Sequence, residues 1–281
     1  MRFTVIGGGA VGLLLASYLA QQGEVTLVVR RQAQQQALQN GLTCMTQQAT
    51  AVYRVRVTLH IPDDEQQHVF ICTKAYALAP VVAALQHVRY KTVSGCQNGL
   101  AHLEALRTLP NSSACVVEFG ALKQDDATVI HTGIGRIVIG ALQGERPIIQ
   151  PMDMLPVVYE ANIEPIVWRK ALLNCLINPL TAIMQVKNGA LVTNEQLFRL
   201  LLQVHQELKG ALPERMRTVS MLDVIALCEK TAANDSSMCV DVRLGRQTEL
   251  EEIVGVILQA CNQPLPTLAT FYAQIQSIYM R

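Results

Sequence analysis

The sequence predicts an α/β fold in two parts: a parallel sheet with covering helices in residues 1–163, and an all-helical part in residues 164–281. Two observations predict this class. A short apolar run, a glycine-rich turn, a helical stretch and a β-branched run follow one another within the first 30 residues, which is the pattern of a βαβ unit. Strand signals then recur until about residue 163, and helical signals replace them beyond it. We therefore expect two domains, each with its own core.

The composition fits a compact enzyme. Of the 281 residues, 50% are hydrophobic and 16% are charged, which argues against a disordered chain. The formal net charge of +1 gives no reason to expect nucleic acid or a membrane surface as a partner. No stretch approaches 18 uninterrupted apolar residues, and the first apolar run is too short for a signal peptide. We expect a cytoplasmic protein, monomer or homodimer, that acts on a small molecule.

The eight cysteines and six histidines are scattered along the chain. They show no Cys-x-x-Cys pair and no other spacing typical of metal ligands. We therefore expect neither a metal site nor a disulfide framework, but free and mostly buried thiols in a reducing compartment.

The glycine-rich turn reads Gly7-Gly8-Gly9-Ala10-Val11-Gly12, a G-x-G-x-x-G pattern. The first glycine permits a tight turn, the second lets the backbone approach a pyrophosphate, and the last lets the helix pack closely on the sheet. The helix N-terminus presents N–H groups and a partial positive charge to phosphates. Because the pattern lies between a predicted strand at 3–6 and a predicted helix at 10–22, we interpret it as a dinucleotide-binding loop.

The end of the second predicted strand, residues 24–29, indicates which dinucleotide binds. NAD enzymes usually have Asp or Glu there, which accepts a hydrogen bond from the ribose 2′-hydroxyl. This chain has Arg30-Arg31 instead, and two guanidinium groups suit a 2′-phosphate. We predict NADPH; the alternative interpretation is a solvated basic turn.

Two further strands are predicted at residues 69–73 and 92–96, each followed by polar residues. Lys74 follows the first, and Gln97-Asn98-Gly99 follows the second. These residues would lie on the rim where parallel sheets bind ligands, although on this evidence alone each could equally be a plain loop. Later strands of the same domain are predicted at 116–119, 129–131 and 136–139.

In the second half, helices are predicted at residues 168–176, 194–209, 219–232 and 248–261. The first contains Lys170, Asn174 and Asn178 at i, i+4 and i+8, which places them on one stripe of an otherwise apolar helix. Buried polar groups need partners, which a bound polar ligand or the neighbouring backbone could supply. Pro179 is expected to end or kink this helix near Asn178.

A second polar cluster runs from Asn234 to Met238 and is followed by Glu249. Thr248 and Glu251 have the spacing of a capping box, so we expect a helix to begin at Thr248 with Glu249 in its first turn. An acid in that position can simply complement the helix dipole, which is the favoured interpretation on spacing alone.

Together these motifs resemble the ketopantoate reductase family over nearly the whole chain. The most specific stretches are Trp168-Arg169-Lys170 with Asn174, Ile177-Asn178-Pro179-Leu180-Thr181-Ala182, and Ser236-Ser237-Met238 with Glu249 twelve residues after Ser237. The resemblance implies a Rossmann-like N-terminal domain and a helical C-terminal domain similar to that of 6-phosphogluconate dehydrogenase. It also implies an oxidoreductase that uses NADPH to reduce 2-dehydropantoate to pantoate in pantothenate and coenzyme A biosynthesis.

The resemblance assigns roles to individual residues. Lys170 matches the catalytic lysine, which protonates the developing alkoxide, and Glu249 matches an essential glutamate. The positions that match substrate-binding residues are Asn98, Asn174, Asn178, Asn234 and Ser237. Those that match cofactor-binding residues are Gly7, Gly8, Gly9, Ala10, Val11, Gly12, Arg30, Lys74, Asn98 and Glu249. We hypothesise that the Glu249 carboxylate favours the ammonium form of Lys170.

The chain departs from the family pattern at Ile253-Val254-Gly255, where Ile-Asn-Gly is common. Two alternatives therefore stay open: a reductase of another branched 2-keto acid, and a non-catalytic NADP(H) sensor. The sensor is disfavoured because Lys170 and Glu249 are both present. A lactate or malate type of dehydrogenase is disfavoured because no histidine lies in a comparable constellation.

Overall fold

The computed structural model describes residues 1–152 and 154–279, and its internal contacts divide the chain into two compact units. Unit 1 comprises residues 1–97 and 102–163, and unit 2 comprises residues 98–101 and 164–281. The short segment 98–101 therefore belongs with the helical unit, although it begins only three residues after the end of β7 (Thr92–Gly95) in unit 1.

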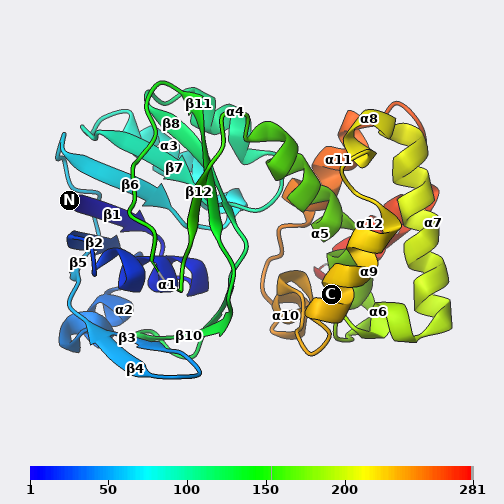
Figure 1. The fold of residues 1–281 in the computed structure, drawn as a ribbon, viewed down its shortest axis with the longest axis horizontal. Coiled ribbons are helices and arrows are strands. Elements are labelled where there is room, and N and C mark those ends of the chain that lie inside the picture. Colours follow the sequence, from blue (N-terminus) through cyan, green and yellow to red (C-terminus); the bar gives the residue numbers. More distant parts are fainter. Residues whose placement is uncertain (153, 280–281) are drawn as a thin grey trace. The chain divides into compact units, whose positions relative to one another are not determined.

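Unit 1 contains an eight-stranded sheet in the order β12-β11-β8-β7-β6-β1-β2-β5 (Figure 1). The six neighbouring strands from β8 to β5 are parallel, which confirms the predicted α/β class, whereas β11 pairs antiparallel with β8. The strands are β1 (Arg2–Ile6), β2 (Glu24–Val28), β5 (Arg56–Thr58), β6 (Gln67–Ile71), β7 (Thr92–Gly95), β8 (Ser112–Val117), β11 (Ile137–Gln143) and β12 (Val157–Tyr159).

A second, four-stranded sheet in the order β4-β3-β10-β9 was not predicted as a separate sheet. Its strands are β3 (Leu42–Met45), β4 (Thr50–Tyr53), β9 (Gly120–Lys123) and β10 (Thr128–Gly133). The predicted strand at 129–131 was therefore correct, but it lies in this sheet and not in the larger one. Strands β3 and β4 are short and half exposed, so their sequences carry a weak apolar signal.

Helix α1 (Ala10–Leu19) lies between the two sheets, as Figure 1 shows. It packs on β1 and β2 with one side and on β3, β9 and β10 with the other. Every residue from Gly12 to Leu19 is buried for this reason, and the helix is apolar all round instead of amphipathic.

The other face of the large sheet has its own apolar core, which includes Ile6, Val69 and Val93. Helices α3 (Leu78–Leu85) and α4 (His102–Arg107) cover it with Leu78, Leu85 and Leu106. The remaining short elements of unit 1 are α2 (Gln32–Ala37), η1 (Leu38–Asn40) and η2 (Ala75–Ala77).

All elements of unit 2 within the described residues are helices. They are α5 (Glu164–Met184), α6 (Ala190–Thr193), α7 (Glu195–Ala211), α8 (Pro213–Met216), α9 (Met221–Lys230), α10 (Ser237–Arg243), the π-helical segment η3 (Glu251–Gly255), α11 (Val256–Ala260) and α12 (Pro266–Tyr279). Helix α5 is central, since α7, α8, α9, α10, η3 and α12 all contact it. Among the described residues, no helix has the length and apolar character needed to cross a membrane.

Pro179 is expected to end or kink α5 near Asn178, and the first of these alternatives is wrong, because the helix includes Pro179 and continues to Met184. A proline inside a helix removes one backbone hydrogen bond and costs about 3 kcal/mol in an isolated helix. Here the whole stretch from Cys175 to Ala182 is buried against the neighbouring helices. Tertiary packing of this kind outweighs a local propensity.

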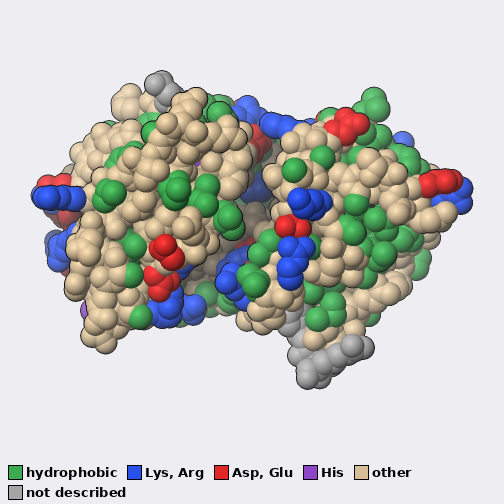
Figure 2. Space-filling view, turned by 90° about the horizontal axis from the view of Figure 1, so that it is seen from below, with side chains coloured by type: hydrophobic (Ala, Val, Ile, Leu, Met, Phe, Trp, Pro, Cys, Tyr) green, Lys and Arg blue, Asp and Glu red, His purple; other side chains and the backbone are tan. Residues whose placement is uncertain are grey.

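Charged side chains on the surface occur largely as neighbours of opposite sign. Figure 2 shows acidic and basic groups adjoining at several places on one face. Ion pairs among exposed residues include Arg89 with Asp63 and Arg136 with Glu118. Exposed pairs of this kind contribute roughly 0–1 kcal/mol each, so the cores and not the surface charges stabilise the fold.

The contact between α1 and the second sheet includes a buried histidine. Nδ1 of His131 lies 2.6 Å from the Tyr18 hydroxyl, and Nε2 lies 3.0 Å from the Gly133 carbonyl oxygen. A neutral ring satisfies both, since Nε2–H donates to the carbonyl and Nδ1 accepts from the hydroxyl. Burial lowers the pKa of His131, and it raises the pKa of Tyr18 to about 12.

We predict that His131 makes stability fall as the pH drops below about 6.5, the ordinary pKa of histidine. The unfolded chain then binds a proton that the folded protein excludes, so the free energy of unfolding decreases with decreasing pH. Replacing His131 by Gln should cost about 2 kcal/mol at pH 7 and flatten this dependence between pH 7 and 5. Denaturant unfolding at several pH values measures both effects, with exposed His87→Gln as the control; an unchanged slope in His131→Gln would contradict the prediction.

Candidate active site

The three glycines of the G-x-G-x-x-G loop differ in what surrounds them. Gly7 has φ +120°, and a Cβ there would lie 2.9 Å from the backbone of Cys72 and Thr73. A Cβ on Gly12 would lie 1.9 Å from the Gly7 carbonyl oxygen. A Cβ on Gly9 would meet nothing within 4 Å, so this position faces open space. The first and last glycines are thus required by the fold, and the middle one leaves room for a ligand.

Helix α1 begins directly at this loop. Its N-cap residue is Gly9, which provides no side-chain cap, and its first turn has no acidic residue. The first N–H groups of a helix have no intrahelical acceptor and carry a partial positive charge. The loop and the helix N-terminus together therefore fit a bound pyrophosphate.

The polar residues after β6 and β7 lie at the same edge of the sheet as this loop, because the strands are parallel to β1. Lys74 precedes η2, and the buried Gln97 donates to the carbonyl oxygens of Ile71 and Thr73 at 2.9 and 3.2 Å. Thr73 Oγ1 and Gln97 Oε1 are buried without a hydrogen-bond partner among the described residues. Unpaired buried polar atoms at this edge fit a polar ligand.

The two arginines after β2 are both exposed. The guanidinium group of Arg31 forms an ion pair with Asp126, which lies in the turn between β9 and β10. Sequence reasoning did not find Asp126, because 95 positions separate it from Arg31.

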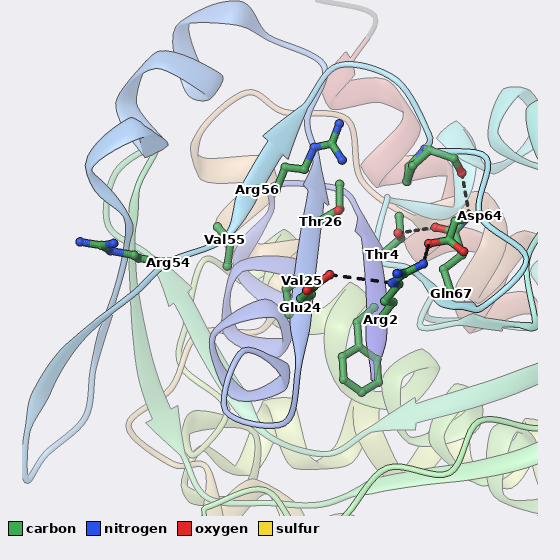
Figure 3. Close-up of a pocket in the computed structure, with 12 residues that line it drawn as sticks. Arg2, Thr4, Glu24, Val25, Thr26, Arg54, Val55, Arg56, Asp64 and Gln67 are labelled. Carbon is green, nitrogen blue, oxygen red and sulfur yellow. Dashed lines mark hydrogen bonds and ion pairs between the residues drawn. The ribbon is translucent and has the colours of Figure 1, made fainter.

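A cavity of about 660 Å³ lies at the opposite, amino-terminal ends of the strands (Figure 3). Arg2, close to its rim, pairs with Glu24 and Asp64 at 3.8 and 2.9 Å. Ligands of parallel sheets bind at the carboxyl ends, so this cavity is not the predicted cofactor site. It is lined by Arg2, Phe3, Thr4, Glu24, Val25, Thr26, Arg54, Val55, Arg56, Pro62, Asp64 and Gln67.

In unit 2 the predicted polar stripe lies on α5. Lys170 and Asn174 are half buried, and Asn178 is 6% exposed. One turn further, the Thr181 hydroxyl lies 2.8 Å from the Ser236 hydroxyl. Ser236 also caps α10 by accepting a hydrogen bond from Cys239 N at 3.1 Å. This buried hydroxyl pair fixes the start of α10 against α5.

The predicted substrate residues Asn234 and Ser237 flank this pair and are both exposed. The carbonyl oxygen of Asn234 accepts from Asn188 N at 3.0 Å, and Ser237 is the first residue of α10. Sequence reasoning placed Ser237 in the site and missed the structural role of Ser236. The spacing of Ser236 from Cys239, which is typical of an N-cap, was the available signal.

The structure brings Asn98 and Glu249 together within unit 2. Glu249 is 4% exposed, and its carboxylate accepts a hydrogen bond from Asn98 Nδ2 at 3.2 Å. The two residues are 151 positions apart. Burying a carboxylate costs free energy unless the group is hydrogen-bonded, and the bond from Asn98 offsets part of that cost.

The helix near Glu249 begins later than predicted. Its first helical residue is Leu250 instead of Thr248, and the Glu249 carbonyl oxygen accepts from Ile253 N at 3.0 Å. Glu251, the expected partner in a capping box, accepts hydrogen bonds from Tyr272 and Gln276 instead. The segment η3 is π-helical, a conformation found often at functional sites.

These features define a class of protein: an α/β unit with a glycine-rich loop at the start of its first helix, joined to a helical unit with a partly buried polar stripe. Among solved structures of this class, one of a probable 2-dehydropantoate 2-reductase from Bacillus subtilis has a TM-score of 0.83 and 30% identity, covering 99% of this chain and 100% of that one. D-mandelate dehydrogenase in complex with NADH has a TM-score of 0.85 at 18% identity, covering 100% of this chain and 99% of that one, which shows the fold alone.

Sequence comparison identifies the family. The N-terminal and C-terminal family models described as "Ketopantoate reductase PanE/ApbA" match residues 3–144 and 162–278. The 2-dehydropantoate 2-reductase of Listeria innocua is 33% identical over 98% of this chain and 95% of its own length. That of Bacillus subtilis is 32% identical over 93% of this chain and 91% of its own length. The chain belongs to the ketopantoate reductase family.

We predict that Gly99 is required for the contact between Asn98 and Glu249. Gly99 has φ +78°, and a Cβ there would lie 2.0 Å from the Glu252 carbonyl oxygen. Gly99→Ala should therefore lower the free energy of unfolding by about 2–4 kcal/mol. Gly245 is the matched control, because it has φ +62° but open space around it, so Gly245→Ala should cost only about 1 kcal/mol. Equal losses in the two variants, measured by denaturant unfolding, would contradict the steric argument.

Proposed function

We propose that this chain catalyses the NADPH-dependent reduction of 2-dehydropantoate to pantoate, a step in pantothenate and coenzyme A biosynthesis. The observation that carries the proposal is the polar stripe of Lys170, Asn174 and Asn178 on the central helix of a chain that belongs to this family. The names of the relatives from Listeria innocua and Bacillus subtilis support the same substrate. We further propose that the protein acts in the cytoplasm, as a monomer or a homodimer.

The residues of unit 1 fit NADPH. The loop from Gly7 to Gly12 and the N-terminus of α1 would hold the pyrophosphate. The open space at Gly9 would let the pyrophosphate come close to the backbone. Arg30 and Lys74 would bind the phosphates, which suits their positions after β2 and β6. When bound, the nicotinamide supplies the hydride that reduces the keto group.

The residues of unit 2 would bind the keto acid and complete the reaction. Hydride addition leaves negative charge on the substrate oxygen, and the Lys170 ammonium group would donate a proton to it. Asn174 and Asn178 would donate hydrogen bonds to the substrate from the same helical stripe. The exposed Asn234 and Ser237 would bind its carboxylate or hydroxyl groups.

Glu249 and Asn98 would act as a pair. Their hydrogen bond orients the Asn98 amide. The second N–H and the carbonyl oxygen of that amide would bind the substrate and the cofactor. The buried carboxylate would also favour the ammonium form of Lys170. The roles of units 1 and 2 as NADP-binding and substrate domains are part of this proposal.

The first test of the proposal is the loss of NADPH absorbance with 2-dehydropantoate as substrate. We expect turnover in the wild type and a decrease in kcat of about 100-fold or more in Lys170→Ala, which is the range for a lost general acid. Lys230→Ala, which removes an exposed lysine at the end of α9, is the matched control and should keep wild-type turnover.

The comparison substrates are 2-oxoisovalerate and NADH. Turnover with 2-oxoisovalerate but not with 2-dehydropantoate would show that the proposed substrate is wrong and that the proposed type of reaction is right. Tight NADPH binding without turnover of either acid would refute the reductase.

For Glu249 we predict that the Gln variant loses turnover but keeps its cofactor. Glutamine retains an oxygen that can accept from Asn98, while it removes the negative charge that would, under this proposal, favour protonated Lys170. The value of kcat should fall at least tenfold, with less than a threefold change in the dissociation constant of NADPH. Steady-state kinetics and fluorescence titration give the two quantities; unchanged kcat would rule out the charge effect.

A further inference from the structure

A carboxylate from a distant part of the sequence lies close to the residues that follow β2. Asp126, in the turn between β9 and β10, accepts hydrogen bonds from the Arg31 guanidinium group and from Lys123 Nζ, the latter at 2.8 Å. The Asp126 side chain is 28% exposed, so the group is partly shielded but open to a ligand. Asp126 thus lies between two cations beside the predicted binding site of the 2′-phosphate.

The turn that contains Asp126 is tied to the glycine loop itself. The Gly8 carbonyl oxygen accepts hydrogen bonds from Lys123 Nζ at 3.1 Å and from Gln34 Nε2 at 2.8 Å. Gln34, which is 4% exposed, also donates to the Asp126 carbonyl oxygen at 3.1 Å. These bonds hold the carboxylate at a defined place beside the loop, unlike a freely moving surface acid.

The two neighbouring cations keep Asp126 charged. The hydrogen bonds from Lys123 and then Arg31 lower the pKa of this carboxyl group below its usual value. It is therefore an anion at neutral pH, and it cancels one of the positive charges offered by Arg30, Arg31 and Lys123.

We propose that Asp126 is a specificity-determining residue that limits the preference of this protein for NADPH over NADH. This inference rests on the proposed function, in so far as that function places a dinucleotide at the glycine loop. A 2′-phosphate has to compete with Asp126 for the Arg31 guanidinium group. A 2′-hydroxyl, in contrast, can donate a hydrogen bond to this carboxylate, as it does to the acid of NAD enzymes.

The chain therefore combines two arrangements that usually exclude each other. An arginine pair after the second strand suits a 2′-phosphate, and an acid at the same place suits a 2′-hydroxyl. In this protein the acid comes from the second sheet, which explains why the residues directly after β2 indicate NADPH alone.

The test replaces Asp126 by Asn, which removes the charge and keeps an acceptor oxygen. The matched control is Asp125→Asn, because Asp125 lies in the same turn but accepts from Ala127 N. Fluorescence titration at low salt gives the dissociation constants of NADPH and NADH for the wild type and both variants. Steady-state kinetics with 2-dehydropantoate gives kcat and KM for each cofactor.

In Asp126→Asn we expect NADPH to bind at least threefold more tightly and the ratio of NADH to NADPH dissociation constants to rise about fivefold or more. Asp125→Asn should keep the wild-type ratio within twofold. An unchanged or lower ratio in Asp126→Asn would overturn the proposal, because Asp126 would then merely orient Arg31 and Lys123. An equal rise in both variants would overturn it as well, since net charge alone would explain the effect.

The binding data separate this inference from the proposed function. If the wild type binds both dinucleotides but reduces no keto acid, the reductase function fails, and the ratio of dissociation constants still decides the role of Asp126. If the wild type binds neither dinucleotide, both proposals are wrong.

Discussion

The close approach of α1 to the end of β1 is the constraint on which the rest of unit 1 depends. A side chain on Gly12 would lie 1.9 Å from the Gly7 carbonyl oxygen, so the helix can start here only because this position has no Cβ. The same approach points the N-terminus of α1 to the carboxyl edge of the sheet, where parallel strands bind ligands. It also leaves the opposite side of α1 free to bury itself against the second sheet. One steric requirement thus determines both where the helix N-terminus lies and how α1 enters the core.

Unit 2 depends in a similar way on polar groups that are buried in pairs. The Thr181 and Ser236 hydroxyls and the pair of Asn98 and Glu249 each satisfy a group that would be costly to bury alone. A hydrogen bond is lost when its two groups move apart, so these pairs fix the start of α10 against α5 and the residues before η3 against Asn98.

Much of the fold and part of the site followed from local patterns in the sequence. The parallel strands β1, β2, β6 and β7, the glycine loop, α1, α7 and α9 were predicted because periodicity and glycine spacing act over a few residues. Strands β5 and β12 were not predicted. The second sheet was missed, since β3 and β4 are short and half exposed. The end of α5 was wrong because burial around Pro179 outweighs its local preference, which no window of the sequence reveals.

The sequence by itself determined the α/β class, the family, and the residue types available for chemistry, above all the glycine loop and the stripe from Lys170 to Asn178. Those properties depend on the order and spacing of neighbouring residues. Only the tertiary structure decided that Asp126 meets Arg31 and that Asn98 meets Glu249. These partners are 95 and 151 positions apart, and contacts at such separations form only when sheets and helices pack around a common core.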